Sequence, residues 1–146
     1  MKRILLLTSL LAWSLQGLAQ NEIVDQWYNE EKSSIITVSK NSNGTYSGKI
    51  TWLEDNTNAD GSSPRRDEFN PEASRQNRLL KGLTILTDLE YNREDQQWQN
   101  GLIYDPENGK TYECYCELNE DGTLYFKGYI LGITWLGRST TWTRVE

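Results

Sequence analysis

The chain has 146 residues, with 15 basic side chains, 21 acidic ones and no histidine. The lack of histidine excludes Ser-His-Asp and Cys-His catalysis and every histidine-ligated metal site. An acidic chain without a basic stripe is also a poor binder of nucleic acid, because neutralising phosphates requires clustered Lys and Arg. We therefore expect no nucleic-acid partner, no cofactor and no metal.

Residues 1–19 have the pattern of a secretory signal peptide: two basic residues, a short apolar run, and small residues ending at Ala19. The run is too short for a membrane-spanning helix, and no later run is long enough. Cleavage after Ala19 removes Lys2 and Arg3 and leaves residues 20–146, with 13 basic and 21 acidic side chains and a net charge of −8. This length fits one domain. We expect an exported protein.

Turn dipeptides divide the remaining chain into strands. Asn43-Gly44, Asn108-Gly109 and Asp121-Gly122 each separate two runs of alternating apolar and polar residues, as in hairpins of half-buried strands. Asn100-Gly101 falls inside a run and is interpreted as a β-bulge. Short strands at regular spacing predict an antiparallel sandwich or barrel of seven to nine strands. The expected strands are Trp27–Glu31, Ser34–Lys40, Thr45–Leu53, Leu83–Leu89, Leu102–Tyr104, Lys110–Leu118, Leu124–Leu131 and Ser139–Val145.

A polar connection of 28 residues, Glu54–Lys81, interrupts this rhythm. Connections of this length are usually functional or disordered. Asn70, followed by proline and glutamate, predicts the start of a helix of one to two turns. Two compatible interpretations are open for this loop. In the first, an Asp67–Arg78 ion pair and an Asn70 cap hold the loop in place. In the second, the loop is a lid on which Arg78 binds a ligand carboxylate or phosphate.

Six segments of the chain resemble a known family, and they follow one another in the same order as in that family. Residues 101–112 read Gly-Leu-Ile-Tyr-Asp-Pro-Glu-Asn-Gly-Lys-Thr-Tyr, and an Asp-x-x-Asn-Pro element precedes them at Asp67–Pro71. The other segments are Arg78–Gly82, Thr123–Tyr129, Leu136–Arg138 and Thr141–Arg144. Together they resemble a bacterial secreted family, domain of unknown function 2147. The resemblance covers almost all of the chain after Ala19.

The resemblance implies an all-β fold: a single antiparallel up-and-down barrel of about eight strands, similar to lipocalins and calycins, with one long polar loop carrying a short helix. It also implies export, to the periplasm of a Gram-negative bacterium or outside the cell, and it implies no known activity. Lipocalin-like chains often open with Gly-x-Trp, and here Asp25 stands in place of the glycine. In such barrels an arginine of the last strand commonly covers that tryptophan. By position, the resemblance pairs Arg144 with Trp27, a cation–π contact that would stabilise barrel closure.

An eight-stranded barrel either fills with side chains or holds one small ligand. The inward aromatic residues predicted by alternation are bulky, whereas Gly48, Gly128 and the two cysteines leave room. We therefore consider first a barrel that binds a small apolar or amphipathic, lipid-like ligand. A solid barrel acting through its surface, in envelope assembly or stress, is the alternative. The candidate ligand-binding residues are Tyr46, Trp52, Arg78, Tyr112, Phe126 and Trp142.

A carboxylate-based hydrolase is a third alternative, although no spacing singles out a catalytic pair. Asp105 and Gly109 have the chemistry of a turn, and we assign them no catalytic role. Cys114 and Cys116 point to the same face of a strand. Packing is the favoured interpretation for them, with a disulfide or a soft-metal site as alternatives. Trp135 is expected at one end of the barrel, as a plug rather than an exposed contact.

Overall fold

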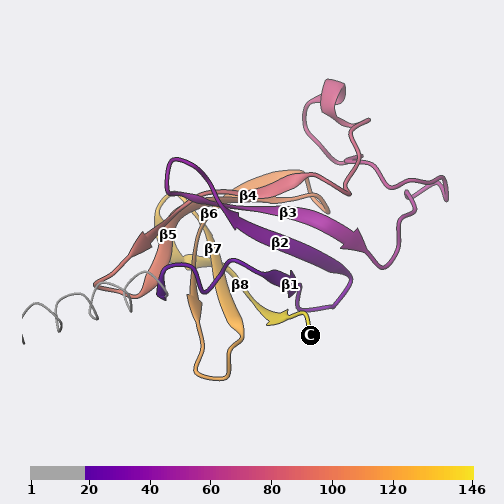
Figure 1. Cartoon of the computed structure of the whole chain (residues 1–146). Helices are drawn as coiled ribbons and strands as arrows, with labels where there is room; N and C mark the ends of the chain where they lie inside the picture. The colour runs from indigo at the N-terminus through magenta and orange to yellow at the C-terminus, as the bar shows by residue number, and fades with distance from the viewer. Residues whose placement is uncertain (1–18) are drawn as a thin grey trace, which may run out of the picture.

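The computed structural model describes residues 19–146, apart from the side chain of Thr134. The predicted signal peptide thus lies outside the described residues, except for Ala19. Eight antiparallel strands form a closed barrel in which each strand pairs with the next and β8 pairs with β1 (Figure 1). The predicted all-β, up-and-down barrel is confirmed. The strands are β1 Gln26–Tyr28, β2 Ser34–Lys40, β3 Tyr46–Leu53, β4 Thr84–Asn92, β5 Gln97–Asp105, β6 Lys110–Leu118, β7 Leu124–Ile130 and β8 Ile133–Arg144.

The strand bounds follow the turn dipeptides closely. β2 and β6 have the predicted bounds, while β5 and β8 begin several residues earlier than expected. The predicted bulge at Asn100-Gly101 is confirmed, because the β5–β6 register shifts between Trp98 and Gly101 and Asn100 has a φ of 60°. Bulges of this kind increase the local twist that a closed barrel needs.

The long loop between β3 and β4 extends away from the barrel at the upper right of Figure 1. Its helix is shorter than predicted: a single 3-10 turn, η1, at Ala73–Arg75. The N-cap is Glu72, without a side-chain cap, and not Asn70 as predicted. The side chain of Asn70 instead accepts a hydrogen bond from the backbone N–H of Glu72 at 2.9 Å. The amide therefore forms an Asx turn ahead of η1 rather than a cap.

Trp52 does not face the barrel interior, which corrects the prediction from alternation. Ile36 pairs with Ile50 across the β2–β3 ladder, but Ile35 pairs with Trp52, so Thr51 is an extra residue. This bulge reverses the alternation beyond it, and Trp52 lies on the outer surface, 39% exposed. There its ring meets the edge of Tyr28, with ring centroids 6.1 Å apart.

A packed core occupies the barrel interior. Tyr46, Phe126 and Trp142 are 0%, 1% and 3% exposed, and the Phe126 and Trp142 ring centroids are 4.1 Å apart. The lack of a side chain at Gly48 leaves no free space in the interior, because neighbouring side chains fill it. A Cβ on Gly48 would lie 3.0 Å from Ile36 Cγ2 and 3.1 Å from Leu86 Cβ. The segment that precedes β1 adds to this core.

That segment, residues 19–25, is tied to core side chains. Ile23 is fully buried, and its carbonyl accepts a hydrogen bond from Trp27 Nε1 at 2.9 Å. Trp98 Nε1 donates to the Gln20 carbonyl at 3.2 Å, and the Tyr46 hydroxyl donates to Asn21 Oδ1 at 3.4 Å. The polar side-chain atoms of Trp27, Trp98 and Tyr46 are therefore satisfied by the N-terminal segment, as buried indole and phenol groups require.

Candidate functional site

The long loop is held to the barrel by a cluster of polar side chains around Asp67. The Asp67 side chain is fully buried and accepts three hydrogen bonds: from Tyr104 Oη at 2.6 Å, from Arg78 Nε at 2.7 Å and from Asn70 Nδ2 at 2.8 Å. The ion pair compensates the charge of the buried carboxylate, and the other two donors add neutral hydrogen bonds to it. The structure thus brings Asp67, Asn70 and Arg78 together.

Tyr104 is the barrel residue of this polar cluster, and it was not among the residues predicted from the sequence. Burial raises its pKa, and the hydrogen bond and negative charge of Asp67 raise it further. The Arg78 guanidinium lies over the ring, with Cζ 5.5 Å from the centroid. The only sequence signal was position: Tyr104 directly precedes the turn at Asp105 in the segment that carried the family resemblance.

The β5–β6 turn approaches the loop closely at Gly109. A Cβ on Gly109 would lie 1.9 Å from the Phe69 carbonyl oxygen and 3.2 Å from Pro71 Cδ, and the φ of 69° also favours glycine. Asp105 forms the turn as predicted, since its carboxylate accepts from Glu107 N at 2.9 Å. Glycine at this position therefore lets the turn and the loop touch.

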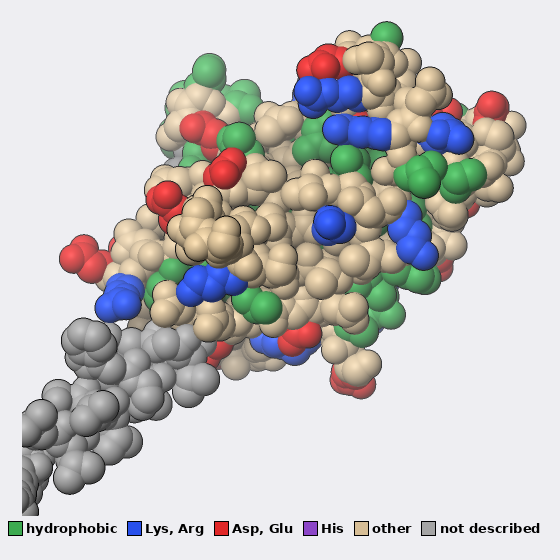
Figure 2. Space-filling view, turned by 45° about the horizontal axis from the view of Figure 1, so that its top comes forward, with side chains coloured by type: hydrophobic (Ala, Val, Ile, Leu, Met, Phe, Trp, Pro, Cys, Tyr) green, Lys and Arg blue, Asp and Glu red, His purple; other side chains and the backbone are tan. Residues whose placement is uncertain are grey.

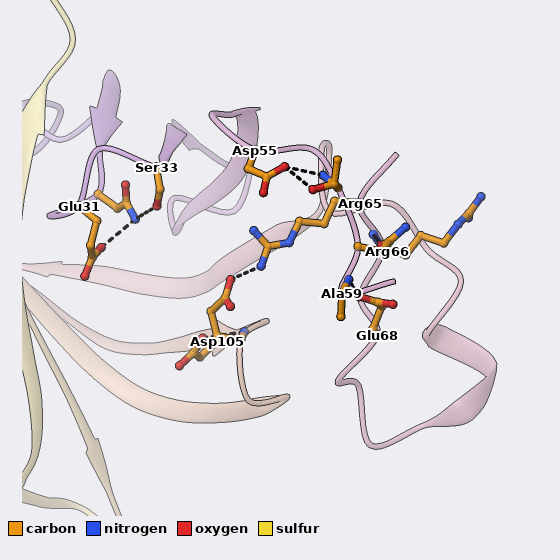
Figure 3. A network of polar contacts seen from close by, with 12 residues as sticks. Glu31, Ser33, Asp55, Ala59, Arg65, Arg66, Glu68 and Asp105 are labelled. Carbon is orange, nitrogen blue, oxygen red and sulfur yellow. Dashed lines mark hydrogen bonds and ion pairs between the residues drawn. The ribbon is translucent and has the colours of Figure 1, made fainter. Parts of the chain in front are cut away.

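A second ion pair fixes the outer part of the loop. Figure 3 shows Arg65 extended toward the β5–β6 turn, where its guanidinium pairs with Glu107. Within the loop, Glu68 Oε2 accepts a hydrogen bond from Ala59 N at 3.0 Å (Figure 3). The loop is consequently a folded unit anchored at two points on the barrel.

A surface cleft of about 270 Å³ lies between the loop and the barrel wall, and we call it the loop cleft. Leu102 and Thr111 line it from the outer faces of β5 and β6, and Arg75 and Arg78 line it from the loop. Figure 2 shows blue Lys and Arg side chains gathered at the upper right, over the long loop. The Arg78 side chain is 35% exposed although it is paired with Asp67. Glu72 also lines the cleft. A partly exposed guanidinium beside apolar and threonine side chains can bind an anionic headgroup.

The other predicted ligand-binding residues do not meet at this cleft. Tyr46, Phe126 and Trp142 lie in the core, and Trp52 lies on the outer surface. Tyr112 is half-buried near the β5–β6 turn, where its hydroxyl accepts a hydrogen bond from Asn108 Nδ2 at 3.1 Å. The six predicted residues therefore form no single site.

The closure of the barrel brings Trp27 and Arg144 together. The two residues are register partners of β1 and β8, and Arg144 Cζ lies 4.5 Å from the ring centroid of Trp27. Arg144 also forms an ion pair with Asp25, the residue that stands in place of the usual glycine. The tryptophan is fully buried, so this contact shields the seam between the first and last strands.

Cys114 and Cys116 are free thiols buried in the core. Burial raises the pKa of Cys114 to about 12 and raises that of Cys116 well above its usual value. Their position matches the packing interpretation, and thiols that stay protonated are poor nucleophiles and metal ligands. Among residues 19–146, no three His, Cys, Asp or Glu side chains are grouped so as to hold a metal ion.

The closed eight-stranded barrel, with arginine over the opening tryptophan, defines a lipocalin-like protein. A solved structure described as "Protein HP1028 from the human pathogen Helicobacter pylori belongs to the lipocalin family" is similar, with a TM-score of 0.71, 25% identity, and 85% of this chain and 83% of that chain covered. Residues 25–144 match the family described as "Uncharacterized protein conserved in bacteria (DUF2147)", and the chain belongs to that family. No curated protein matches the chain. Within the described part, no helix is long and apolar enough to cross a membrane.

Proposed function

We propose that the protein is an exported, non-enzymatic barrel that binds a small amphipathic anion, with the anionic group held in the loop cleft. The lipocalin-like fold supports a binding role, since barrels of this size commonly hold one small ligand. The packed interior supports a site beneath the loop rather than in the barrel lumen, where alternation had predicted it. A cleft of about 270 Å³ suits a small ligand or one end of a larger one.

The observation that carries this proposal is the placement of two guanidinium groups in one cleft with the exposed apolar side chain of Leu102. Arg78 is held in place by Asp67 and stacked on Tyr104, which fixes the direction of its remaining donors. Arg75 forms an exposed ion pair with Glu72, which also lines the cleft, with Nε and Oε2 2.8 Å apart. Exposed pairs of this kind are weak, so the arginine side chain can turn to a ligand at low cost. Leu102, 41% exposed on the barrel wall, provides the apolar contact.

Native mass spectrometry of the protein purified from the envelope of its own host tests both export and binding. A chain beginning at Gln20 is expected, with an added mass that is lost on denaturation. Arg75→Gln should reduce the occupancy of that adduct. Lys81→Gln, which removes an exposed cation of the same loop outside the cleft, should leave it unchanged. An adduct with full occupancy in Arg75→Gln would contradict the loop cleft as the site, and a bare wild-type mass would contradict the binding role.

A solid barrel that acts through its surface is the second candidate, and the packed interior favours it. It predicts a bare mass in the native spectrum. It also requires a surface that recognises a partner, and the β7–β8 hairpin offers one.

A further inference from the structure

The β7–β8 hairpin ends in an apolar tip that projects into solvent. Leu131 and Trp135 are 86% and 80% exposed, and Ile130 and Leu136 beside them are 42% and 41% exposed. We call these four residues the hairpin tip. Trp135 is therefore not the plug that the sequence analysis expected. Exposed apolar residues that lie singly need no explanation, but four on one hairpin mark an interaction site.

Leu131 occupies a backbone position that does not suit leucine. Ile130 pairs with Ile133, so Leu131 and Gly132 form a two-residue turn, with φ values of 55° and 68°. Turns with two positive φ values favour Asn-Gly or Asp-Gly, because leucine pays a steric cost there. Of the non-glycine residues with positive φ in the described part of the chain, Leu131 is the only apolar one. Strain of this kind is typical of functional positions.

Trp135 is pushed outward by an irregularity in β8. Tyr129 and Ile130 are neighbours in β7, but they pair with Gly137 and Ile133 of β8. Residues 134–136 of β8 therefore have no partner in β7 and form a bulge of three extra residues. The base of this bulge is tight, since a Cβ on Gly137 would lie 1.9 Å from the Gly128 carbonyl oxygen. The tryptophan therefore extends from a bulge whose base lies directly against β7.

The charges around the hairpin tip are mainly positive. Lys127 and Arg138, both on the hairpin, flank the tip, and Lys127 Nζ donates to the Gly137 carbonyl at 3.5 Å. The nearby carboxylate belongs to Glu113, and its Oε2 accepts a hydrogen bond from Gly132 N at 2.7 Å. This acid is engaged by the backbone of the turn, while Arg138 is exposed to solvent. An acidic chain therefore has, at this hairpin, an apolar tip with two cations behind it.

We propose that the hairpin tip inserts into the surface of a lipid bilayer that contains anionic headgroups. Leucine and isoleucine side chains enter the acyl region, tryptophan prefers the interface, and Lys or Arg behind them meets the anionic headgroups. The net charge, −6 for the full chain and −8 for residues 20–146, repels an anionic surface elsewhere on the molecule, so the tip sets the orientation of binding. The tip shares no residue with the loop cleft, and this proposal is independent of the ligand.

Binding to vesicles of phosphatidylethanolamine and phosphatidylglycerol, followed by sedimentation, tests the proposal. Leu131→Asn and Trp135→Ser should each weaken partitioning about tenfold or more, because each removes most of one buried apolar side chain. Leu131→Asn also places a residue that suits positive φ in the turn, so its Tm should be unchanged or raised, which separates lost binding from lost folding. Leu79→Asn, at an apolar residue of the long loop that is 45% exposed, is the matched control and should bind as the wild type does.

Two further readings use the same samples. Lipids brominated on the acyl chain should quench part of the tryptophan fluorescence of the wild type. In Trp135→Ser, which lacks the inserted tryptophan, the same lipids should quench none of the remaining tryptophan fluorescence. Replacing phosphatidylglycerol with phosphatidylcholine, or adding salt, should weaken binding. Wild-type protein that stays in the supernatant would overturn the proposal. So would a concentration-dependent dimer abolished by Leu131→Asn, because the tip would then bind a second copy of the chain.

Discussion

Two glycines with positive φ allow backbone strain and close approach to be measured separately. At Gly44, φ is 88° and a Cβ would meet nothing within 4 Å, whereas at Gly109 a Cβ would overlap the Phe69 carbonyl. Gly44→Ala should lower the free energy of unfolding by about 1 kcal/mol, the cost of a left-handed residue alone. Gly109→Ala should lower it by about 2–4 kcal/mol, since the loop must also move away from the turn. Urea denaturation of both variants provides the comparison, and equal losses would contradict the contact.

The buried Cys114 thiol links stability to pH. Its pKa rises from 9.0 to about 12 on folding, so above pH 9 the unfolded chain releases a proton that the folded chain keeps. The free energy of unfolding should therefore fall as pH rises from 9 toward 12, by at most about 1.4 kcal/mol per pH unit for this one group. Tyrosines with raised pKa values lower the stability in the same pH range. The contribution of Cys114 is therefore the difference between the wild type and Cys114→Ala in the slope of unfolding free energy against pH.

Urea unfolding at a series of pH values from neutral upward measures this slope. The variant should show a shallower decline than the wild type, whatever its stability at neutral pH. A labelling experiment provides the control: a thiol reagent should modify Cys114 and Cys116 only after unfolding, because both are buried and free. Identical slopes in wild type and variant would mean that the thiol does not titrate as its burial requires.

Among individual residues, the sequence could predict an interacting pair but not the other side chains that surround the pair in the fold. The Asp67–Arg78 pair followed from the opposite charges and small polar residues of one loop. Tyr104 was missed, because its partner Asp67 is 37 residues away and no local pattern connects them. Such a contact depends on how the loop folds back on the barrel wall, which is a property of the tertiary structure.

At the level of elements, alternation predicted the inward face of a strand up to the first bulge. Thr51 is the extra residue of β3, and the side chain beyond it faces the opposite way. Trp52→Ala should therefore lower the free energy of unfolding by about 1 kcal/mol or less, whereas Trp142→Ala, at a core position of β8, should lower it by about 3–5 kcal/mol. Thermal or urea denaturation compares them. Similar losses at the two positions would place Trp52 in the core after all.

The strands and turns were predictable because Asn-Gly and Asp-Gly mark hairpins by local backbone preference. The helix in the long loop was overestimated for a related reason. Asn70 is a good N-cap in isolation, but its amide also donates to Asp67 Oδ2 at 2.8 Å and to the Tyr104 hydroxyl at 3.1 Å. These tertiary hydrogen bonds fix Asn70 ahead of η1, and the helix is reduced to one turn.

For the whole molecule, the state of the barrel interior was the question that the sequence left open. The answer depends on side chains from strands far apart in the chain. Gly101 is an example. A Cβ on this residue of β5 would lie 2.5 Å from Leu89 Cδ2, which shows that the leucine of β4 already fills the space beside the glycine. No count of bulky and small residues along a single strand contains that information.

A packed interior predicts that the barrel takes up an apolar molecule only when a core side chain is removed. Phe126 is 1% exposed and its ring packs at a tilt against that of Trp142, so Phe126→Ala should lower the free energy of unfolding by about 3–5 kcal/mol and leave an apolar cavity. Cavities lined by apolar groups stay dry and bind small probes such as benzene or xenon. Benzene should therefore raise the Tm of Phe126→Ala and leave that of the wild type unchanged, because a ligand stabilises only the state that binds it. Leu131→Asn, outside the barrel, is the control. A rise in wild-type Tm with benzene would mean that the native lumen already has room for a ligand, and would return the binding site to the interior.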